Sequence, residues 1–396
     1  MHRKFRVFWE RAGKHFFTLK GDSRNLSVPS YLPSKFQRIH LELTNKCNFS
    51  CLFCPDGVMT RERGVMEEDL ARSALDQIAD LDIAEKVTFH VMGEPLLHPR
   101  FFEILDYAAS RNLAVGLTTN GALLTPPIIQ QLAARNLHQI DISLQTPDRE
   151  SFLATRGTRM DFHKYKDRVL ELLSACADSP EPPIFKIRIM TTRFASGLRE
   201  KRGIPNFMGS SAKLRETVLE WTELVHQRLG SPVERERLIK KIKKISIHGW
   251  NVIEISPKVF IETYILTDWG NAFAGEELVE NRRGYCFGMR DHFAILYSGD
   301  VVLCCVDFDG RTAVGNLKNA SLLDILRSPE LERIVKGFHR GILLDPHCRH
   351  CLGSSSHIGS WLNPAASIIG LKLLKPFLYR KYRLFDQSQA DRIESS

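Results

Sequence analysis

The sequence lacks the features of a membrane-spanning or secreted chain. No run approaches the roughly 18 apolar residues that a transmembrane helix needs, and the first residues contain no apolar core of a signal peptide. It also lacks a lysine and arginine tract interleaved with aromatics, so its net charge of +9 gives little support for nucleic-acid binding. Nine cysteines in 396 residues do not indicate a disulfide scaffold. We therefore expect a cytoplasmic protein that binds no nucleic acid, in which the clustered cysteines bind metal.

Three of the cysteines stand close together after an apolar, strand-like run. Cys47, Cys51 and Cys54 have the spacing C-x3-C-x2-C, and the Asn, Ser, Pro and Gly residues around them predict a loop. A loop can bring three sulfur atoms to one point. Three thiolates leave one iron of a [4Fe–4S] cluster without a protein ligand, and that iron can bind a small molecule. A structural zinc loop is the alternative, although zinc loops usually contain two Cys or Cys/His pairs.

From residue 36 to residue 192 the sequence alternates short apolar runs with amphipathic segments. This alternation predicts βαβ units and a parallel sheet, with functional loops at the carboxyl ends of the strands. The expected strands are 37–43, 86–91, 114–118, 139–144 and 184–191, and the expected helices are 67–81, 99–111, 126–136 and 161–176. Later segments predict a loop over 194–213, a helix over 214–230, a basic run over 233–245 that faces solvent or an anionic partner, and a last barrel strand within 251–266.

With Phe53 just before its third cysteine, the motif resembles that of the radical S-adenosylmethionine (SAM) superfamily. The resemblance implies an α/β fold built as a partial, TIM-like (β/α)6 barrel. It also implies a [4Fe–4S] cluster whose open iron binds SAM, and an enzyme that cleaves SAM reductively to a 5′-deoxyadenosyl radical. An electron donor of the flavodoxin or ferredoxin type is implied as well.

Three further strand ends are similar to the SAM-binding motifs of this family. Met92-Gly93-Glu94-Pro95 is similar to Gly-Gly-Glu-Pro, with Met92 in place of the first glycine. Read alone, each of these segments is also compatible with an ordinary turn. An arginine suits the SAM carboxylate because its planar guanidinium pairs with a carboxylate through two hydrogen bonds. The resemblance assigns SAM binding to Phe53, Gly93, Glu94, Asn120, Ser143, Gln145 and Arg156.

A second set of cysteines lies between residues 284 and 351. Residues 299–304 predict a hairpin turn that leads into a short strand, and a C-x2-C pair closes the set. Adjacent strand residues face opposite sides, so we expect Cys304 and not Cys305 to be a ligand. The region resembles the auxiliary-cluster domains called SPASM and Twitch. Four thiolates can ligate one auxiliary [4Fe–4S] cluster completely, with zinc as the alternative; the expected ligands are Cys286, Cys304, Cys348 and Cys351.

The sequence also suggests what such an enzyme would act on. Only 46 residues precede the first cluster cysteine, which is short for a peptide-recognition domain. We therefore expect an oxidoreductase that takes a hydrogen atom from a small polar metabolite, such as a sugar, an aminocyclitol or a nucleotide-linked group. The auxiliary cluster would then accept an electron in a two-electron oxidation. Modification of a ribosomal peptide or protein and a non-enzymatic iron–sulfur electron carrier are the alternatives. His90, Asp307 and Asp309 are candidate bases, and none is assigned.

Four segments are expected along the chain. A basic N-terminal extension covers 1–35, the barrel covers 36–270, the auxiliary-cluster domain covers 271–355, and a basic amphipathic tail covers 356–396. Both ends combine apolar and basic residues. They are expected to pack on the rest of the protein, and peripheral contact with a membrane surface is the alternative.

Overall fold

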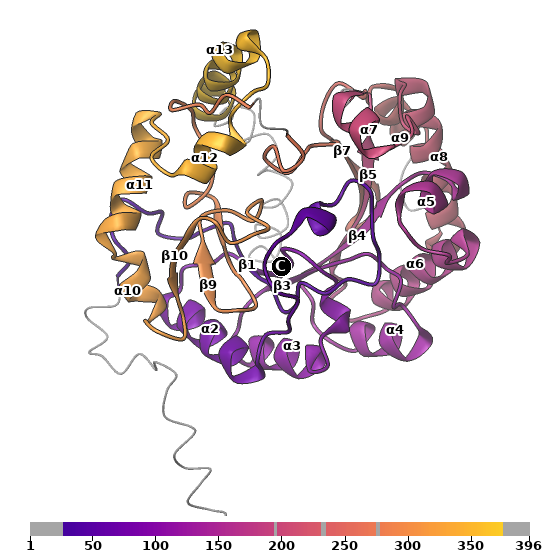
Figure 1. Cartoon of the computed structure of the whole chain (residues 1–396). Helices are drawn as coiled ribbons and strands as arrows, with labels where there is room; N and C mark the ends of the chain where they lie inside the picture. The colour runs from indigo at the N-terminus through magenta and orange to yellow at the C-terminus, as the bar shows by residue number, and fades with distance from the viewer. Residues whose placement is uncertain (1–26, 194–195, 231–234, 275–277, 375–396) are drawn as a thin grey trace, which may run out of the picture.

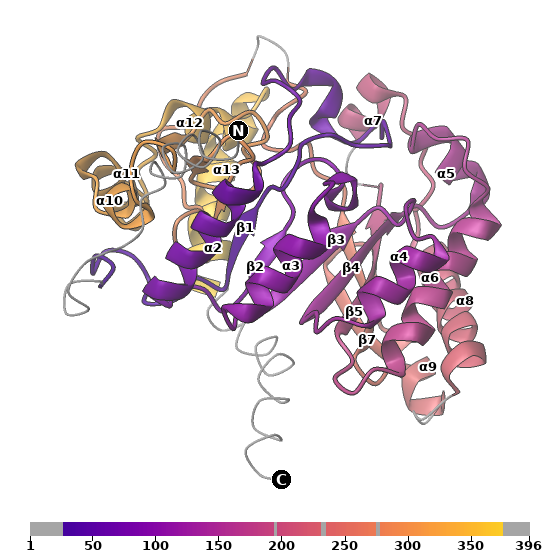
Figure 2. The same cartoon turned by 90° about the horizontal axis from the view of Figure 1, so that it is seen from below.

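A computed structural model describes residues 27–193, 196–230, 235–274 and 278–374 (Figure 1). The basic N-terminal extension up to residue 26 and the part of the basic tail after residue 374 lie outside these ranges. The described strands form one open ten-stranded sheet in the order β10-β9-β8-β1-β2-β3-β4-β5-β7-β6. Helices cover the outer face of this curved sheet (Figures 1 and 2). The chain is an α/β protein with a partial barrel of the TIM type, as the sequence predicts.

The barrel strands run parallel to one another in sequence order, with helices in the connections. The parallel strands are β1 (Arg38–Leu41), β2 (Val87–Phe89), β3 (Val115–Thr119), β4 (Gln139–Gln145), β5 (Ile184–Thr191) and β7 (Val259–Ile265). The helices between them are α2 (Glu68–Leu81), α3 (Phe101–Ser110), α4 (Pro126–Ala133), α5 (Arg149–Thr155), α6 (Phe162–Ala177), α7 (Ser196–Arg202), α8 (Ser211–Leu229) and α9 (Arg235–Lys243). Two short 3-10 turns, η2 (Pro55–Val58) and η3 (Pro95–Leu97), lie in the loops at the carboxyl ends of β1 and β2.

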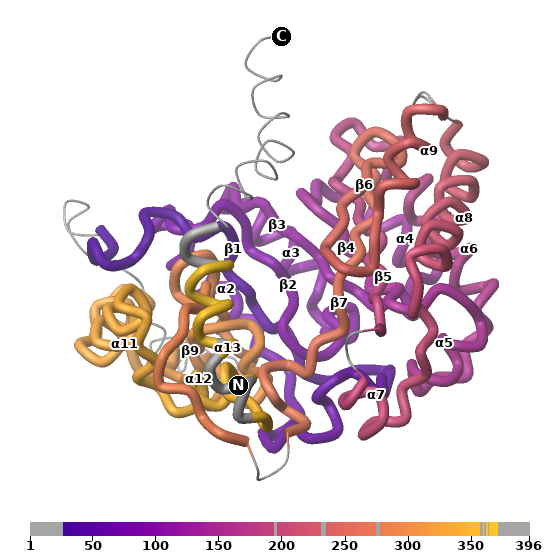
Figure 3. Tube along the Cα trace, turned by 90° about the horizontal axis from the view of Figure 1, so that it is seen from above, coloured from indigo at the N-terminus to yellow at the C-terminus, as the bar shows by residue number. Residues whose placement is uncertain are grey.

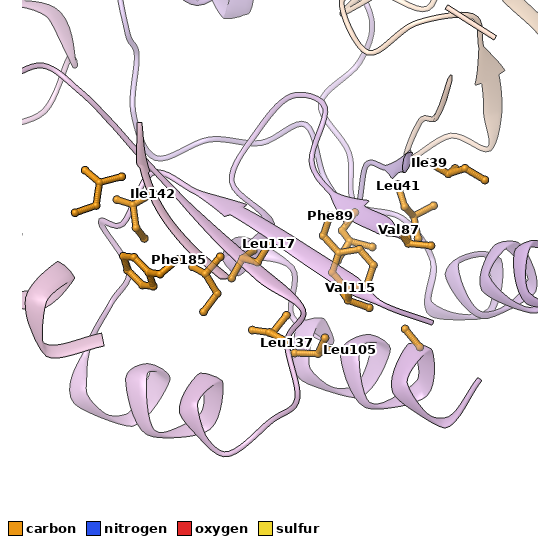
Figure 4. Close-up of a cluster of buried hydrophobic side chains, with 14 of the residues drawn as sticks. Ile39, Leu41, Val87, Phe89, Leu105, Val115, Leu117, Leu137, Ile142 and Phe185 are labelled. Atoms are coloured by element: carbon orange, nitrogen blue, oxygen red, sulfur yellow. The ribbon is translucent and has the colours of Figure 1, made fainter. Parts of the chain in front are cut away.

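The hydrophobic core lies between the sheet and these helices. Ile39 and Leu41 of β1, with Val87 and Phe89 of β2, point toward the helical layer and are fully buried (Figure 4). Burying one such side chain contributes roughly 1.5–3 kcal/mol. Because side chains alternate along a strand, the residues between them point into the barrel interior. On β1 and β2 the residues between these core positions are His40 and Thr88, which are polar.

Two sequence expectations need correction. The segment 251–266 is not one strand: β6 (Asn251–Ser256) and β7 form an antiparallel hairpin, with Lys258 in the turn at φ 59°. The segment 194–213 is not only loop, because it contains α7. The strong helix formers of α7 explain that helix, and Gly203, at φ 64°, follows its end.

The C-terminal region extends the sheet of the barrel. Strand β8 (His292–Ile295) pairs in parallel with β1, and β9 (Asp300–Val302) and β10 (Ala313–Asn316) continue as antiparallel strands. The helices that follow are α10 (Leu322–Leu326), α11 (Pro329–Arg340), α12 (Pro346–Cys351), α13 (His357–Ala366) and the π-helical η4 (Ser367–Leu374). They lie on the side of the barrel opposite α6, α8 and α9 (Figure 3). In the described part of the chain, no helix has the length and apolarity needed to cross a bilayer.

Candidate active site and auxiliary cysteine centre

The loop after β1 carries the first three cysteines, and it is fastened to the end of α5. Ser50 and Leu52 donate backbone hydrogen bonds to the carbonyl oxygens of Arg156 (3.2 Å) and Thr155 (2.8 Å). Gly157 lies so close that a Cβ atom there would be 2.6 Å from the Ser50 carbonyl oxygen, and its φ is 61°. The cluster loop is thus held against a helix end that only a glycine can form.

All three sulfur-bearing residues line one cavity of about 170 Å³ at the carboxyl ends of the strands. Burial raises the pKa of Cys54 to about 12 and that of Cys47 to about 11, and it also raises the pKa of Cys51, although Cys47 has the most exposed surface of the three. Thiols in such surroundings stay protonated unless a cation replaces the protons. Three thiols that converge on one cavity fit a cluster that keeps one iron free of protein ligands.

Gly93 and Glu94 support the cluster loop from the β2 side. Gly93 has φ 74°, and a Cβ atom there would lie 2.4 Å from the Thr44 carbonyl oxygen. The Glu94 backbone donates a hydrogen bond to the Lys46 carbonyl oxygen (2.9 Å). Gly93 lines the cavity, but Glu94 is not among its lining residues.

The Glu94 carboxylate is turned into the protein. It accepts hydrogen bonds from the Thr119 hydroxyl and the Asn120 backbone N–H, both at 2.7 Å, and from Leu96 N–H at 3.2 Å. Burial raises its pKa to about 7, and these hydrogen bonds oppose the rise. Glu94 therefore orders the loop after β3 through residues that line the cavity, and its role in binding SAM stays a prediction.

Asn120 connects that loop to the cysteines. Its side-chain N–H groups donate to the Asn48 side chain (2.8 Å) and toward the Cys47 sulfur (3.6 Å), and the residue lines the cavity. Ser143 and Gln145, at the end of β4, line the cavity as well. Gln145 has φ 64°, a conformation that costs a non-glycine residue on the order of 1 kcal/mol, and the Tyr264 hydroxyl donates a hydrogen bond to its side chain.

Arg156 is the buried cation of the site. Only 2% of its surface is exposed, and its guanidinium lies over the rings of Phe49 (4.9 Å) and Phe53 (5.7 Å). Its Nε has no hydrogen-bond partner in the part of the chain that the structure describes. A buried guanidinium nitrogen without a partner is costly, and a carboxylate placed in the cavity would satisfy it. Arg156 and the aromatic rings thus fit the amino-acid end of SAM.

Sequence reasoning missed several residues that line the cavity: Asp56, Met190, Tyr264 and Trp269. Met190 lies near the end of β5, where strand alternation could have indicated it, and Tyr264 lies near the end of β7. Because one strand was expected within 251–266, neither the turn at residues 257–258 nor the start of β7 was predicted. The side of β7 that faces the cavity therefore did not follow from the sequence. Trp269 follows the barrel and donates a hydrogen bond to the Phe53 carbonyl oxygen (3.1 Å).

The second group of cysteines gathers beside the barrel, at its β8 side. Cys286 hydrogen-bonds Cys304, and Cys348 and Cys351 lie near enough to Cys286 for their charges to interact. The Cys304 sulfur accepts a hydrogen bond from Val306 N–H (3.4 Å), and the Cys286 sulfur accepts one from Gly288 N–H (3.4 Å). Four thiols with backbone donors around them fit a fully ligated cluster.

Cys305 does not follow the strand argument made from the sequence. Strand β9 ends at Val302, so Cys304 and Cys305 lie in a turn where adjacent side chains need not diverge. Ligand atoms of Cys304, Cys305 and His292 all lie within 4.8 Å of one another.

The three candidate bases differ in their surroundings. His90 lines the cavity. Asp307 accepts hydrogen bonds from Thr312 and Arg311, and Asp309 accepts them from Thr60 and Arg61.

Comparisons with known proteins match both cysteine regions. The model of the radical SAM superfamily matches residues 41–191, and that of an iron–sulfur cluster-binding domain, SPASM, matches residues 286–352. The mycofactocin maturase MftC of Mycobacterium ulcerans is 25% identical over 73% of this chain and 76% of its own length. A tungsten-containing aldehyde ferredoxin oxidoreductase cofactor-modifying protein of Pyrococcus furiosus is 30% identical over 30% of this chain. That alignment spans 33% of the Pyrococcus protein, about a third of its length.

One further relative is named for a small-molecule substrate, and two solved structures are similar in fold. The SAM-dependent 2-deoxy-scyllo-inosamine dehydrogenase of Niallia circulans is 35% identical over 24% of this chain and 34% of its own length. The structure of BtrN with AdoMet and 2-DOIA gives a TM-score of 0.46 at 16% identity, covering 77% of this chain and 88% of that one. Streptococcus suis SuiB with its precursor peptide SuiA gives 0.47 at 17% identity, covering 78% and 68%.

The two matched regions contain the two cysteine groups and the barrel strands β2 to β5. The cofactors are therefore a [4Fe–4S] cluster that binds SAM and an auxiliary iron–sulfur cluster. The chain belongs to the radical SAM superfamily and carries a C-terminal SPASM domain.

Proposed function

We propose that the protein oxidises a small polar metabolite by removing a hydrogen atom from one of its C–H bonds. When bound, the reduced cluster and SAM supply the carbon-centred radical that takes this hydrogen atom. The chain would bind the cluster through Cys47, Cys51 and Cys54, and Arg156 would pair with the SAM carboxylate. A buried ion pair of this kind fixes the position of the cofactor and keeps water away from the reacting carbon.

The observation that supports a polar substrate is the character of the barrel interior. Met190 and Tyr264 line the cavity, and two residues earlier on the same strands Arg188 and Glu262 face the same way. The Arg188 Nε lies 3.3 Å from a Glu262 carboxylate oxygen, and its guanidinium lies over the Tyr264 ring at 4.9 Å. TIM barrels usually fill their interior with branched apolar side chains. Charged groups in that place favour a substrate with hydroxyl, amino or acidic groups.

The auxiliary centre favours an oxidation over an isomerisation. Four thiol ligands satisfy all four irons of a [4Fe–4S] cluster, which suits electron transfer better than substrate binding. A proton must also leave the substrate. Of the three candidate bases only His90 lines the cavity; burial lowers its pKa to about 4, so the ring is neutral near pH 7 but is a weak proton acceptor there. A flavodoxin- or ferredoxin-type protein would supply the first electron.

Modification of a ribosomal peptide is the second candidate. The match to the mycofactocin maturase favours it, because that alignment covers 76% of the maturase and 73% of this chain. Both cysteine regions lie within the two family matches.

One experiment tests the proposal. Anaerobically reconstituted protein is incubated with dithionite, SAM and pools of deuterated metabolites, and 5′-deoxyadenosine is analysed by mass spectrometry. Deuterium in 5′-deoxyadenosine, together with a product two hydrogens lighter than the substrate, would support the proposal. The Cys51→Ala variant serves as the control and should form no 5′-deoxyadenosine. Deuterium transfer from peptides alone would favour the second candidate, and no SAM cleavage at all would contradict both.

A further inference from the structure

One short segment touches both cofactor centres. We call residues 268–271, which follow β7, the bridge. Near its start Trp269 lines the SAM cavity, and the indole N–H donates a hydrogen bond to the Phe53 carbonyl oxygen (3.1 Å). The next residue, Gly270, lies so close to Cys351 that a Cβ atom there would be 2.7 Å from the cysteine sulfur. Two adjacent residues therefore connect the wall of the SAM cavity to an expected ligand of the auxiliary cluster.

The backbone of the bridge is strained. Trp269, Gly270 and Asn271 all have positive φ, at 54°, 67° and 66°. Residues other than glycine visit this left-handed region mostly as single residues, because the Cβ atom crowds the backbone there. Such conformations persist only where the surrounding structure over-determines them. The bridge is therefore expected to relax when a contact that holds it is removed.

Asn271 supplies the contact on the auxiliary side. Its side-chain amide donates toward three carbonyl oxygens at the end of α12 and just beyond it, those of His350 (2.8 Å), Gly353 (3.1 Å) and Cys351 (3.2 Å). His350 Nε2 in turn lies 3.2 Å from the Asn271 carbonyl oxygen. The last carbonyl groups of a helix have no partner within the helix, so they accept such donors readily. Asn271 thus fastens the bridge to the helix that carries Cys348 and Cys351.

The cavity side of the bridge is packed as well. Trp269 and Cys54 pack against the same small apolar group, which includes Met92 of the barrel and Phe308 of the SPASM region. The indole is therefore held between the cluster loop, through its hydrogen bond to Phe53, and the auxiliary helix, through the rest of the bridge.

We propose that Asn271 is a positioning residue for SAM: it keeps Trp269 in the cavity wall, so that tight SAM binding requires a loaded auxiliary centre. A cluster bound through Cys351 would fix the sulfur that Gly270 touches, and with it the end of α12. Without that cluster the strained bridge would relax, and the indole would leave the wall. By linkage, SAM and the auxiliary cluster favour each other's binding by the same factor.

This coupling does not depend on the identity of the substrate. For the proposed oxidation it would limit radical formation in protein that lacks the electron acceptor, because such protein would bind SAM only weakly.

Equilibrium binding of SAM tests the coupling directly. The wild type, Asn271→Gly, the double variant Cys348→Ala and Cys351→Ala, and the combination of all three changes are loaded anaerobically with iron and sulfide. Iron is counted, and SAM affinity is measured by isothermal titration. Glycine at position 271 keeps the positive φ and removes only the amide. Asn112→Gly is the matched control, because Asn112 is an exposed asparagine at φ 56° just after α3.

The proposal expects Asn271→Gly to keep its iron and to bind SAM about tenfold more weakly, within the usual range of such couplings. The double cysteine variant should lose a similar factor. Adding Asn271→Gly to it should weaken SAM binding no further, because the changes break one connection. Asn112→Gly should bind SAM as the wild type does. Unchanged SAM affinity in Asn271→Gly, or effects that multiply in the combined variant, would overturn the proposal.

If Asn271→Gly also loses iron, Trp269→Leu decides the matter, because it leaves α12 unchanged. This variant should keep its iron and bind SAM about tenfold more weakly, and removing the cysteine pair from it should have no further effect. Wild-type affinity in Trp269→Leu, or a further loss on removal of the cysteine pair, contradicts the proposal.

Discussion

At the scale of single residues, Arg156 shows how one side chain serves both the fold and the cofactor. Its carbonyl oxygen holds the cluster loop through Ser50, while its guanidinium faces the cavity between two aromatic rings. We predict that Arg156→Lys weakens SAM binding about 10- to 100-fold, because a hydrogen bond to a charged group contributes roughly 1.5–3 kcal/mol.

Isothermal titration of the cluster-loaded protein with SAM measures this effect. Arg159→Lys is the control, since Arg159 lies three positions away and is exposed. Equal SAM affinity in the two variants would show that Arg156 does not contact the cofactor.

Glu94 leads to a prediction about pH. Its pKa rises from 4.5 to about 7 in the folded protein because burial disfavours the carboxylate. A carboxyl group with a raised pKa binds more protons when folded than when unfolded, so stability falls as the pH rises from about 4.5 to about 7. Glu94→Gln removes this titration. We expect the wild type to lose stability relative to Glu94→Gln across that range. Urea unfolding of cluster-free protein at several pH values measures it, and parallel pH profiles would contradict the prediction.

At the scale of elements, the loops at the strand ends are built on close backbone approach. A Cβ atom at Gly93 would meet the Thr44 carbonyl oxygen at 2.4 Å, whereas one at Gly203 would meet nothing within 4 Å, although both residues have positive φ. Gly203→Ala should therefore cost only the left-handed conformation, about 1–2 kcal/mol. Gly93→Ala adds a clash with backbone and should cost about 3 kcal/mol or more.

Denaturant unfolding of the two alanine variants compares these costs directly. If Gly93→Ala were no less stable than Gly203→Ala, the loop after β2 would have to move freely. In that case the two variants should also bind SAM equally well.

The elements that the sequence predicts best are those with a strong period. The strands before the cluster loop and before Gly93 follow from apolar runs bounded by turn residues, and the structure confirms the alternation of strands and helices. The hairpin of β6 and β7 was not predicted in this way, because the two strands follow one another in the sequence with only Pro257-Lys258 between them. The pairing of β8 with β1 joins residues about 250 positions apart, which no local pattern reports.

The candidate site likewise contains residues that the sequence predicts and residues that it does not. Motif residues such as Cys51 and Asn120 lie at the cavity where the sequence places them. Glu94 accepts a hydrogen bond from the backbone of the loop after β3, a contact that the motif alone does not indicate. The closeness of His292 to Cys304 and Cys305 was also missed, since it depends on which strands become neighbours and on where β9 ends.

At the scale of the whole molecule, the barrel and the SPASM region share one sheet and one buried ion pair. Glu42, after β1, accepts hydrogen bonds from Arg61 (2.6 Å) and from the backbone of Tyr297 (3.2 Å), while Arg61 also donates to the Phe308 carbonyl oxygen (2.6 Å). Phe36 packs against Phe293 with 4.9 Å between ring centroids. The loop that follows the first cysteines is therefore bound to the auxiliary region, and the two cofactor sites are held at a fixed separation.

This arrangement separates the roles of the two cysteine groups in an experiment. The double variant Cys348→Ala and Cys351→Ala removes the C-x2-C pair on α12 and leaves the cluster loop untouched. We predict that it loses about four iron atoms per chain, the content of one cluster. SAM cleavage by dithionite-reduced protein should persist, because the three cysteines of the loop and Arg156 remain. Oxidised product should fall to background, because the substrate radical has lost its electron acceptor. Cys176→Ala, which changes a thiol outside both groups, should behave as the wild type. Undiminished product from the double variant would mean that the second cluster supports the structure and takes no part in the oxidation.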